Sequence, residues 1–305
     1  MQQLQGRKYN VFNNLLSKAK SKGKIRVAVA QPTDETSLRG VIDSYNEDLI
    51  DPILIGDQEK IRQVASDLEL DISPYEIVSA ASDVEAATKA VEFATRGDVK
   101  ALMKGNLHTN DLMSAVIKRD AGLRTDRSIT HTFIMDIPAY HKALFITDAA
   151  INIAPDINAK MSIIKNTIDL AHRLGIKIPK VAVLSAVEMP YEKMPSSIEA
   201  AKLTQRAKTE IKDALVYGPL AFDNAISAVS AKIKKIDSEV CGDPDVLVVP
   251  QIESGNILFK ALVYLAYAKS AGVVLGAKVP VILTSRADSA ESRVASSALA
   301  VLASA

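Results

Sequence analysis

Short apolar runs rich in β-branched residues alternate with longer amphipathic segments along most of this chain. The runs have the length of buried strands, and the segments place apolar residues at the spacing of a helix face. This alternation is typical of a mostly parallel sheet with helices on both faces, so we expect an α/β fold. The expected strands are Ile25–Ala30, Pro52–Ile55, Tyr75–Val78, Lys100–Met103, Ile129–Asp136, Ala143–Thr147, Lys180–Ser185, Asp245–Pro250, Gly272–Val274 and Val279–Thr284. The expected helices are Thr36–Asp48, Glu59–Leu68, Val84–Arg96, one from Thr109, Ile157–Leu174, Ser197–Ala207, Asn256–Ala268 and Ala290–Leu302.

These strands are too many for one small sheet. The chain has 305 residues, and single hydrophobic cores stop growing at about 250–300 residues. We therefore expect two α/β domains. Hydrophobic residues make up 48% of the chain and aromatic residues 5%, so alanine, valine, leucine and isoleucine must fill the cores.

Charge and cysteine content exclude several classes of protein. The net charge of +1 leaves no basic excess for a nucleic-acid backbone or an anionic membrane. The single cysteine, Cys241, can form no disulfide within the chain. Residues 1–24 lack the apolar core of a signal peptide. No apolar run approaches the ~20 residues of a membrane span, so we expect a cytoplasmic protein.

The turns that follow strands are the places to look for function, because ligands of open α/β sheets bind at the carboxyl ends of strands. The first such turn holds Lys104, Gly105, His108 and Thr109. Its glycine allows the backbone to approach a ligand, Thr109 can cap the next helix, and free N–H groups beside Lys104 favour phosphate. The alternative is a plain turn with a capping threonine.

A second turn, Pro250–Asn256, follows an apolar run and opens a long apolar helix. Ser254 or Asn256 can be the N-cap of that helix. The alternatives are an anion site at the helix N-terminus and helix capping alone.

The third turn, Thr284–Ser289, delivers a hydroxyl, a guanidinium and a carboxylate within a few residues. Asp288 is the expected N-cap of the helix that follows. Arg286 lies where the helix dipole disfavours a positive charge, which indicates an anionic partner. A surface salt bridge is the alternative.

The histidines His108, His131, His141 and His172 are not spaced as metal ligands, so we expect no metal site. His131 lies within an apolar run and is expected in the core. The sequence contains no P-loop, no Gly-x-Gly-x-x-Gly fingerprint and no Gly-x-Ser-x-Gly elbow.

Several short motifs, taken together and in order, cover nearly the whole chain and resemble the phosphate acetyl/butyryltransferase family, most closely its butyryl branch. The motifs are Leu102–Thr109, Thr147–Asn152, Val183–Glu188 with Met194–Ser196, Asp213–Asn224, Glu253–Asn256 and Thr284–Ser289.

The resemblance implies two α/β domains with mostly parallel sheets and an active-site cleft between them, as in the isocitrate and isopropylmalate dehydrogenases. One domain would be discontinuous, residues 1–140 plus 272–305, and would carry the Ser-Arg motif. Residues 141–271 would form the inserted domain. It also implies a homodimer or a higher homo-oligomer.

The resemblance further implies an acyltransferase that moves a butyryl or acetyl group between coenzyme A and inorganic phosphate. Ser285 would orient the thiol, and Arg286 would bind the phosphoryl oxygens. The acetyl branch has an aspartate base at the position of Ser292, so Asp288 or Glu291 takes that role here, or no strong base is needed. We expect direct attack by the CoA thiolate in a ternary complex, with a preference for butyryl or a similar short chain.

The predicted catalytic residues are therefore Ser285, Arg286 and Asp288. Coenzyme A is a substrate, and no metal or redox cofactor is expected. The predicted substrate-binding residues are Lys104, Gly105, His108, Thr109, Asp148, Asn152, Ser185, Ser254, Gly255, Asn256 and Thr284.

Two other classes of protein stay open. A regulatory relative would bind CoA or an acyl phosphate without turnover, and the missing aspartate at Ser292 supports it. A pyridine-nucleotide hydroxy-acid dehydrogenase would need clustered aspartates for a divalent metal, and the sequence has no such cluster. Loss of free thiol from CoA in the presence of acetyl or butyryl phosphate separates these classes.

Overall fold

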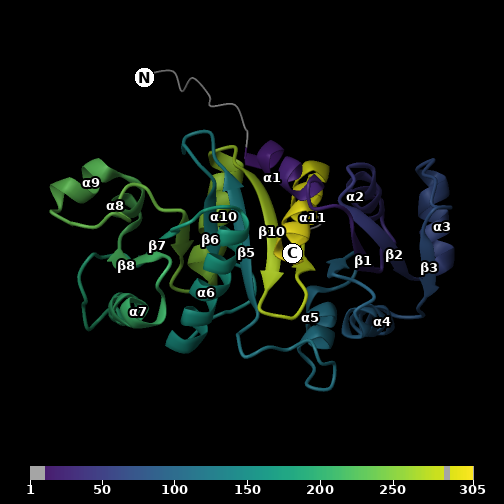
Figure 1. Ribbon diagram of the computed structural model, residues 1–305, viewed down its shortest axis with the longest axis horizontal. Coiled ribbons are helices and arrows are strands. Elements are labelled where there is room, and N and C mark those ends of the chain that lie inside the picture. Colours follow the sequence, from purple (N-terminus) through teal and green to yellow (C-terminus); the bar gives the residue numbers. More distant parts are fainter. Residues whose placement is uncertain (1–10, 285–288, 305) are drawn as a thin grey trace. The chain divides into compact units, whose positions relative to one another are not determined.

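The computed structural model describes residues 11–284 and 289–304, and it confirms the α/β class with mostly parallel strands (Figure 1). Its contacts divide the chain into two compact units. The terminal unit comprises Phe12–Arg127 and the described residues from Ala271 onward, and the central unit comprises Ser128–Ser270 with Val11. The sequence-based boundaries lay after residues 140 and 271.

The terminal unit has strand order β3-β2-β1-β4-β11-β10, in which all neighbours are parallel except the antiparallel pair β10 and β11. Contacts between α2 and α3 and between α2 and α11 place these helices on one face, while α4 and α5 contact each other (Figure 1). The strands are β1 (Ile25–Ala30), β2 (Ile50–Gly56), β3 (Glu76–Ser79), β4 (Ala101–Lys104), β10 (Lys269–Leu275) and β11 (Val281–Ile282). The helices are α1 (Val11–Lys20), α2 (Glu35–Asn46), α3 (Gln58–Asp67), α4 (Asp83–Arg96), α5 (Thr109–Ile117) and α11 (Ala290–Ser304).

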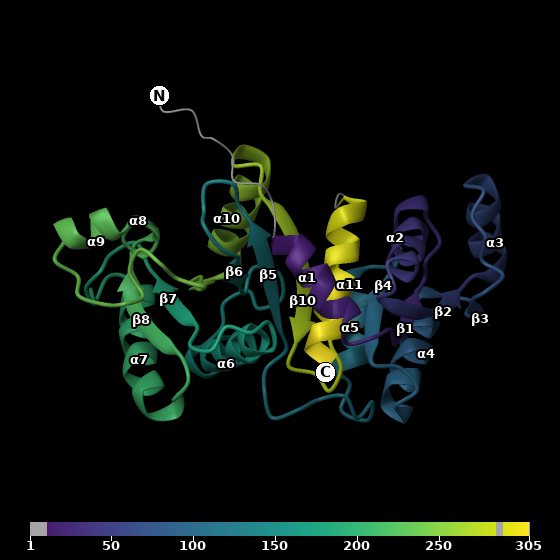
Figure 2. The same ribbon diagram turned by 45° about the horizontal axis from the view of Figure 1, so that its top comes forward.

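The central unit has strand order β5-β6-β9-β7-β8, in which β5 and β6 are antiparallel and the remaining neighbours are parallel. Figure 2 shows α6 and α7 on one side of these strands and α8, α9 and α10 on the other. The strands are β5 (Thr130–Asp136), β6 (Leu144–Thr147), β7 (Lys180–Leu184), β8 (Leu215–Leu220) and β9 (Val246–Val248). The helices are α6 (Ile157–Arg173), α7 (Pro195–Glu210), α8 (Phe222–Ile226), α9 (Ala228–Ile233) and α10 (Ile252–Leu265).

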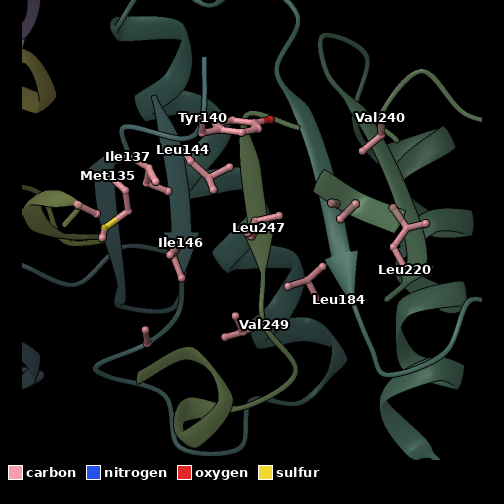
Figure 3. Close-up of a cluster of buried hydrophobic side chains, with 14 residues drawn as sticks. Met135, Ile137, Tyr140, Leu144, Ile146, Leu184, Leu220, Val240, Leu247 and Val249 are labelled. Carbon is pink, nitrogen blue, oxygen red and sulfur yellow. The ribbon is translucent and has the colours of Figure 1, made fainter. Parts of the chain in front are cut away.

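Aliphatic side chains from neighbouring strands form the core of the central unit. Ile146 on β6, Leu247 on β9, Leu184 on β7 and Leu220 on β8 belong to one buried cluster (Figure 3). Burying such a side chain contributes about 1.5–3 kcal/mol relative to leaving it exposed. The cluster therefore holds the strands that carry the predicted site residues of this unit at their carboxyl ends.

Two features of the fold differ from the sequence-based expectation. Strand β8, helix α1 and the short helices α8 and α9 were not predicted. Helix α10 begins at Ile252 rather than at Asn256 and ends at Leu265. The expected core position of His131 is confirmed, because this residue is fully buried on β5.

Candidate active site

The carboxyl edge of the terminal sheet carries the first predicted turn and Thr284, the residue with which the third predicted turn begins. Lys104, the last residue of β4, is in register with Ala30, the last residue of β1. Ile282 on β11 is in register with Met103. Because all three strands are parallel, Thr284 and the turn after Lys104 lie at the same edge of the sheet.

Gly105 is required by an approach of backbone to backbone. Its N–H donates to the carbonyl of Ala30 at 2.8 Å, and the next N–H, of Asn106, donates to the carbonyl of Gln31 at 2.6 Å. A Cβ at Gly105 would lie 2.5 Å from the Ala30 oxygen and would also meet the carbonyl of Gln31. The sequence-based reason for this glycine was a ligand, but here it is the neighbouring strand end.

Lys104 is buried at this edge, with 8% of its surface exposed. Its Nζ donates to the carbonyl oxygens of Gly105 at 3.1 Å and Leu107 at 3.0 Å. The ammonium group therefore holds the turn in shape.

The N-cap of α5 is His108 and not Thr109, which is the first residue of the helix. The His108 side chain makes no capping hydrogen bond and is exposed. Among the described residues, none accepts a hydrogen bond from the N–H of Thr109 or of Asn110. Within the part of the chain that the structure describes, these two N–H groups at the positive end of α5 therefore have no acceptor, and the exposed His108 imidazole lies next to them.

All three predicted catalytic residues, Ser285, Arg286 and Asp288, lie outside the described residues. The expectation of a cap at Asp288 is corrected by α11 itself. The hydroxyl of Ser289 accepts from the N–H of Ser292 at 3.1 Å, and the Ser289 carbonyl accepts from the N–H of Arg293 at 3.2 Å. Ser289 is therefore the N-cap of α11.

The carboxyl edge of the central sheet gathers the remaining predicted residues. Thr147, the last residue of β6, and Val183 on β7 are both in register with Val248, the last residue of β9. The turns that begin at Asp148 and Ser185, and the turn between β9 and α10, therefore share one edge.

Asp148 and Asn152 are hydrogen-bonded to each other and to the backbone around them. Asp148 is 2% exposed, and its Oδ1 accepts from the N–H groups of Ala150 and Ile151 at 2.9 and 3.0 Å. Its Oδ2 accepts from Asn152 Nδ2 at 2.6 Å, and the same amide donates to the carbonyl of Ile129 at 2.8 Å. These hydrogen bonds shape the turn from inside, because a buried carboxylate needs such donors.

Helix α10 is capped by Gln251, not by Ser254 or Asn256. Gln251 Oε1 accepts from the N–H groups of Glu253 at 2.6 Å and Ser254 at 3.3 Å. The Ile252 N–H donates to the carbonyl of Ile153 at 3.0 Å. The first N–H groups of this helix are thus already hydrogen-bonded within the chain.

Gly255 and Ser185 have local partners as well. A Cβ at Gly255 would lie 2.7 Å from a methyl group of Val249 and 3.0 Å from Cα of Ala149, so the glycine lets α10 contact the Asp148 turn. The Ser185 hydroxyl is 3.0 Å from the Ser196 hydroxyl. Ser185 is 9% exposed at the end of β7.

Sequence reasoning missed Arg293, which is 7% exposed on α11 and donates from Nη1 to Thr284 Oγ1 at 3.0 Å. A signal was available, because Arg293 stands among alanine, serine, valine and leucine on a helix that is otherwise buried after its first turn. Gln251 was missed because glutamine is not among the preferred N-cap residues.

Within residues 11–284 and 289–304, no group of three or more His, Cys, Asp or Glu side chains is placed to hold a metal ion. In the same residues, no helix is both long enough and apolar enough to cross a membrane.

Both units have parallel strands that end in polar turns at the carboxyl edge of the sheet, which is where ligands of open α/β sheets bind. The model of the phosphate acetyl/butaryl transferase family matches residues 11–96 and 80–301. The chain belongs to this family and is an enzyme, a phosphate acyltransferase of the acetyl/butyryl type.

Individual relatives agree with this assignment. The chain is 48% identical to the phosphate acetyltransferase of Rhizobium meliloti, over 95% of this chain and 92% of the relative. It is 39% identical to the phosphate butyryltransferase of Clostridium acetobutylicum, over 95% and 97%. The crystal structure of a branched-chain phosphotransacylase from Enterococcus faecalis V583 matches with a TM-score of 0.80 and 32% identity, covering 92% of this chain and 99% of that chain.

Proposed function

We propose that this enzyme catalyses the reversible conversion of a short-chain acyl-CoA and inorganic phosphate to an acyl phosphate and CoA. The observation that carries the proposal is the carboxyl edge of the terminal sheet. There the first two N–H groups of α5 have no acceptor among the described residues, and the buried ammonium of Lys104 lies beside them. In the sequence, Thr284 at the same edge leads directly into Ser285 and Arg286.

Phosphate is the substrate that suits this edge. Open N–H groups at a helix N-terminus and a fixed positive charge both favour an anion. The exposed imidazole of His108 is available for the phosphate or for the acyl carbonyl oxygen. Lys104 acts mainly through its charge, since its Nζ is bonded to backbone carbonyls. The α10 N-terminus is not part of this phosphate site, because its N–H groups already have acceptors.

Direct acyl transfer needs few groups from the protein. The CoA thiolate attacks the carbonyl carbon of the acyl phosphate, and phosphate leaves with its bonding electrons. A free thiol has a pKa of about 8.5, so modest help suffices near neutral pH. In the proposal, Ser285 orients the thiol and Arg286 binds the phosphoryl oxygens bidentately. Asp288 or Glu291 accepts the thiol proton, or no side-chain base is used.

In the central unit, the predicted site residues Asp148 and Asn152 hold the shape of a turn. Because Asp148 and Asn152 satisfy each other and their turn, we propose that they position the Ala149–Ile151 backbone rather than bind phosphate. Ser185 and Asn256, at the same sheet edge, are proposed to contact the acyl or pantetheine part of the substrate. Ser254 and Gly255 hold the start of α10.

The preference of the enzyme for one acyl chain over another can be measured directly. Sequence features favoured butyryl, whereas the identity to the acetyltransferase named above is higher than that to the butyryltransferase. We therefore expect acetyl-CoA to give the larger kcat/KM when release of free CoA thiol is followed in phosphate buffer. A larger kcat/KM for butyryl-CoA overturns this preference.

Arg286→Ala is the sharpest test of the site. Losing one preorganised donor to developing charge lowers turnover by roughly 10²–10³-fold. The matched control is Arg39→Ala, which removes an exposed guanidinium from α2 and should leave turnover unchanged. Near-normal turnover of the Arg286→Ala variant would contradict the proposed role of Arg286 in binding the phosphoryl oxygens. A wild-type protein that binds CoA without turnover would instead support the regulatory class.

Three finer expectations stay proposals. They are a homodimer or higher oligomer, a cytoplasmic location, and a fold of the isocitrate and isopropylmalate dehydrogenase type. The last is supported by the mostly parallel sheets of both units.

A further inference from the structure

Arg293 is a buried cation in a helix that is otherwise made of small and apolar residues. In α11 the charged side chains are Glu291, which is exposed, and Arg293, which is 7% exposed. Arg293 lies one residue beyond the first turn of the helix, where the helix dipole disfavours a positive charge. Taking a guanidinium out of water also costs several kcal/mol unless it is well hydrogen-bonded. A buried arginine at this position of the helix is therefore destabilising unless other interactions compensate for it.

Helix α2 is built to admit this side chain. Gly40 is buried in the middle of α2, and a Cβ there would lie 2.6 Å from Cδ and 3.3 Å from Cβ of Arg293. Glycine in a helix interior is about 1 kcal/mol less favourable than alanine. The chain accepts this loss at the one place where the aliphatic stem of Arg293 crosses α2.

The guanidinium reaches the end of β11. Nη1 of Arg293 donates to Thr284 Oγ1 at 3.0 Å, and Thr284 is 5% exposed. Thr284 is the residue to which Ser285 is joined. The hydrogen bond therefore restrains the backbone immediately before the Ser-Arg pair.

The charge of Arg293 is also felt at the neighbouring strand end. Burial acts to raise the pKa of Asp34, the N-cap of α2 after β1, but hydrogen bonds from Ser37 and Thr36 and the charge of Arg293 hold that pKa below its usual value. The charge of Arg293 thus acts on the carboxylate that caps α2, at the carboxyl end of β1.

We propose that Arg293 is a positioning residue for acyl transfer: it holds Thr284 in place and supplies a buried positive charge that favours the phosphate and thiolate anions at this edge. The inference rests on the proposed roles of Ser285 and Arg286. It gives the enzyme a way to favour the thiolate without a carboxylate base.

The test compares Arg293→Met, Arg293→Lys, Thr284→Val and the double variant Arg293→Met/Thr284→Val in the full-length enzyme. Methionine keeps much of the volume without the charge, and replacing a buried charged group by an apolar one is often tolerated by the fold. The readouts are KM for phosphate, kcat, and the pH dependence of kcat/KM for CoA. Circular dichroism and thermal unfolding monitor the fold.

Two matched controls separate chemistry from packing. Ser297→Ala removes the buried hydroxyl contact of 2.8 Å with Ser44, between the same two helices, without touching charge. Arg39→Met removes an exposed arginine next to Gly40. Both controls should keep wild-type kinetics, whatever they do to thermal stability.

The expected result for Arg293→Met is a roughly tenfold or larger rise in KM for phosphate. Its pH profile should also move to higher pH by about one unit, since one pKa unit corresponds to a tenfold change in equilibrium. Arg293→Lys should recover part of both effects. Thr284→Val should lower kcat, and the double variant should be less impaired than the product of the single effects.

The proposal is overturned if folded Arg293→Met has wild-type KM, kcat and pH profile, or if it loses only thermal stability. Should Arg293→Met not fold, Thr284→Val and Gly40→Ala decide, because Gly40→Ala displaces the Arg293 stem while favouring the helix. Wild-type kinetics in both then overturn it. Full activity of Arg286→Ala together with impaired Arg293→Met would instead refute the proposed role of Arg286 and leave Arg293 standing.

Discussion

Gly105→Ala tests the backbone contact that shapes the first turn of the site. The new Cβ would lie 2.5 Å from the carbonyl oxygen of Ala30, and neither backbone segment is a flexible side-chain end that can rotate away. Overpacking of this kind costs about 1–3 kcal/mol. Separating the two segments would also break the hydrogen bonds from Gly105 and Asn106, worth about 1 kcal/mol each. We expect a total loss of roughly 3–5 kcal/mol.

Urea unfolding followed by circular dichroism measures this loss, and the transferase assay measures its effect on the site. Gly56→Ala is the matched comparison, because a Cβ there would lie 2.5 Å from Gln31 Oε1, at the end of a side chain that can move. We expect a clearly smaller loss for Gly56→Ala than for Gly105→Ala. Equal unfolding midpoints for wild type and Gly105→Ala would refute the reasoning.

Two further variants test other parts of the structure. Burial acts to raise the pKa of Asp243, but hydrogen bonds from Lys180, Lys142 and His141 hold it well below its usual range. Its stabilising effect is therefore complete above the unfolded pKa of about 3.9 and is lost as pH falls further. Asp243→Asn should be less stable than wild type at pH 7, and the difference should shrink in acid unfolding; a constant difference contradicts this. Gln251→Ala should cost about 1 kcal/mol in urea unfolding, and an unchanged midpoint contradicts its capping role.

The alternation of apolar runs and amphipathic segments predicted most strands of both units, because buried parallel strands are continuously apolar over several residues. Strand β8 escaped because Gly218 and Pro219 interrupt its pattern. A proline is tolerated there since β8 lies at the end of the strand order, where one side of the strand has no neighbour to receive a hydrogen bond.

The helix starts were harder to predict than the strands. Thr109, Ser254 and Asp288 are all good capping residues by type, yet the caps are His108, Gln251 and Ser289. Which of several adjacent polar residues becomes the N-cap depends on the φ and ψ angles of the residues that connect the strand to the helix. Those angles depend on packing of the turn against neighbouring strands.

The sequence by itself determined the α/β class and the family, and it singled out three turns as candidates for function, because these depend on local periodicity and on short motifs. Only the tertiary structure decided why Gly105 and Gly40 are glycines and why Arg293 is buried. Each depends on the approach of segments far apart in the chain: Gly105 on the end of β1, and Gly40 on the stem of Arg293. Steric contacts between such segments, and the free energy of burying a charge between them, cannot be predicted from a local sequence pattern.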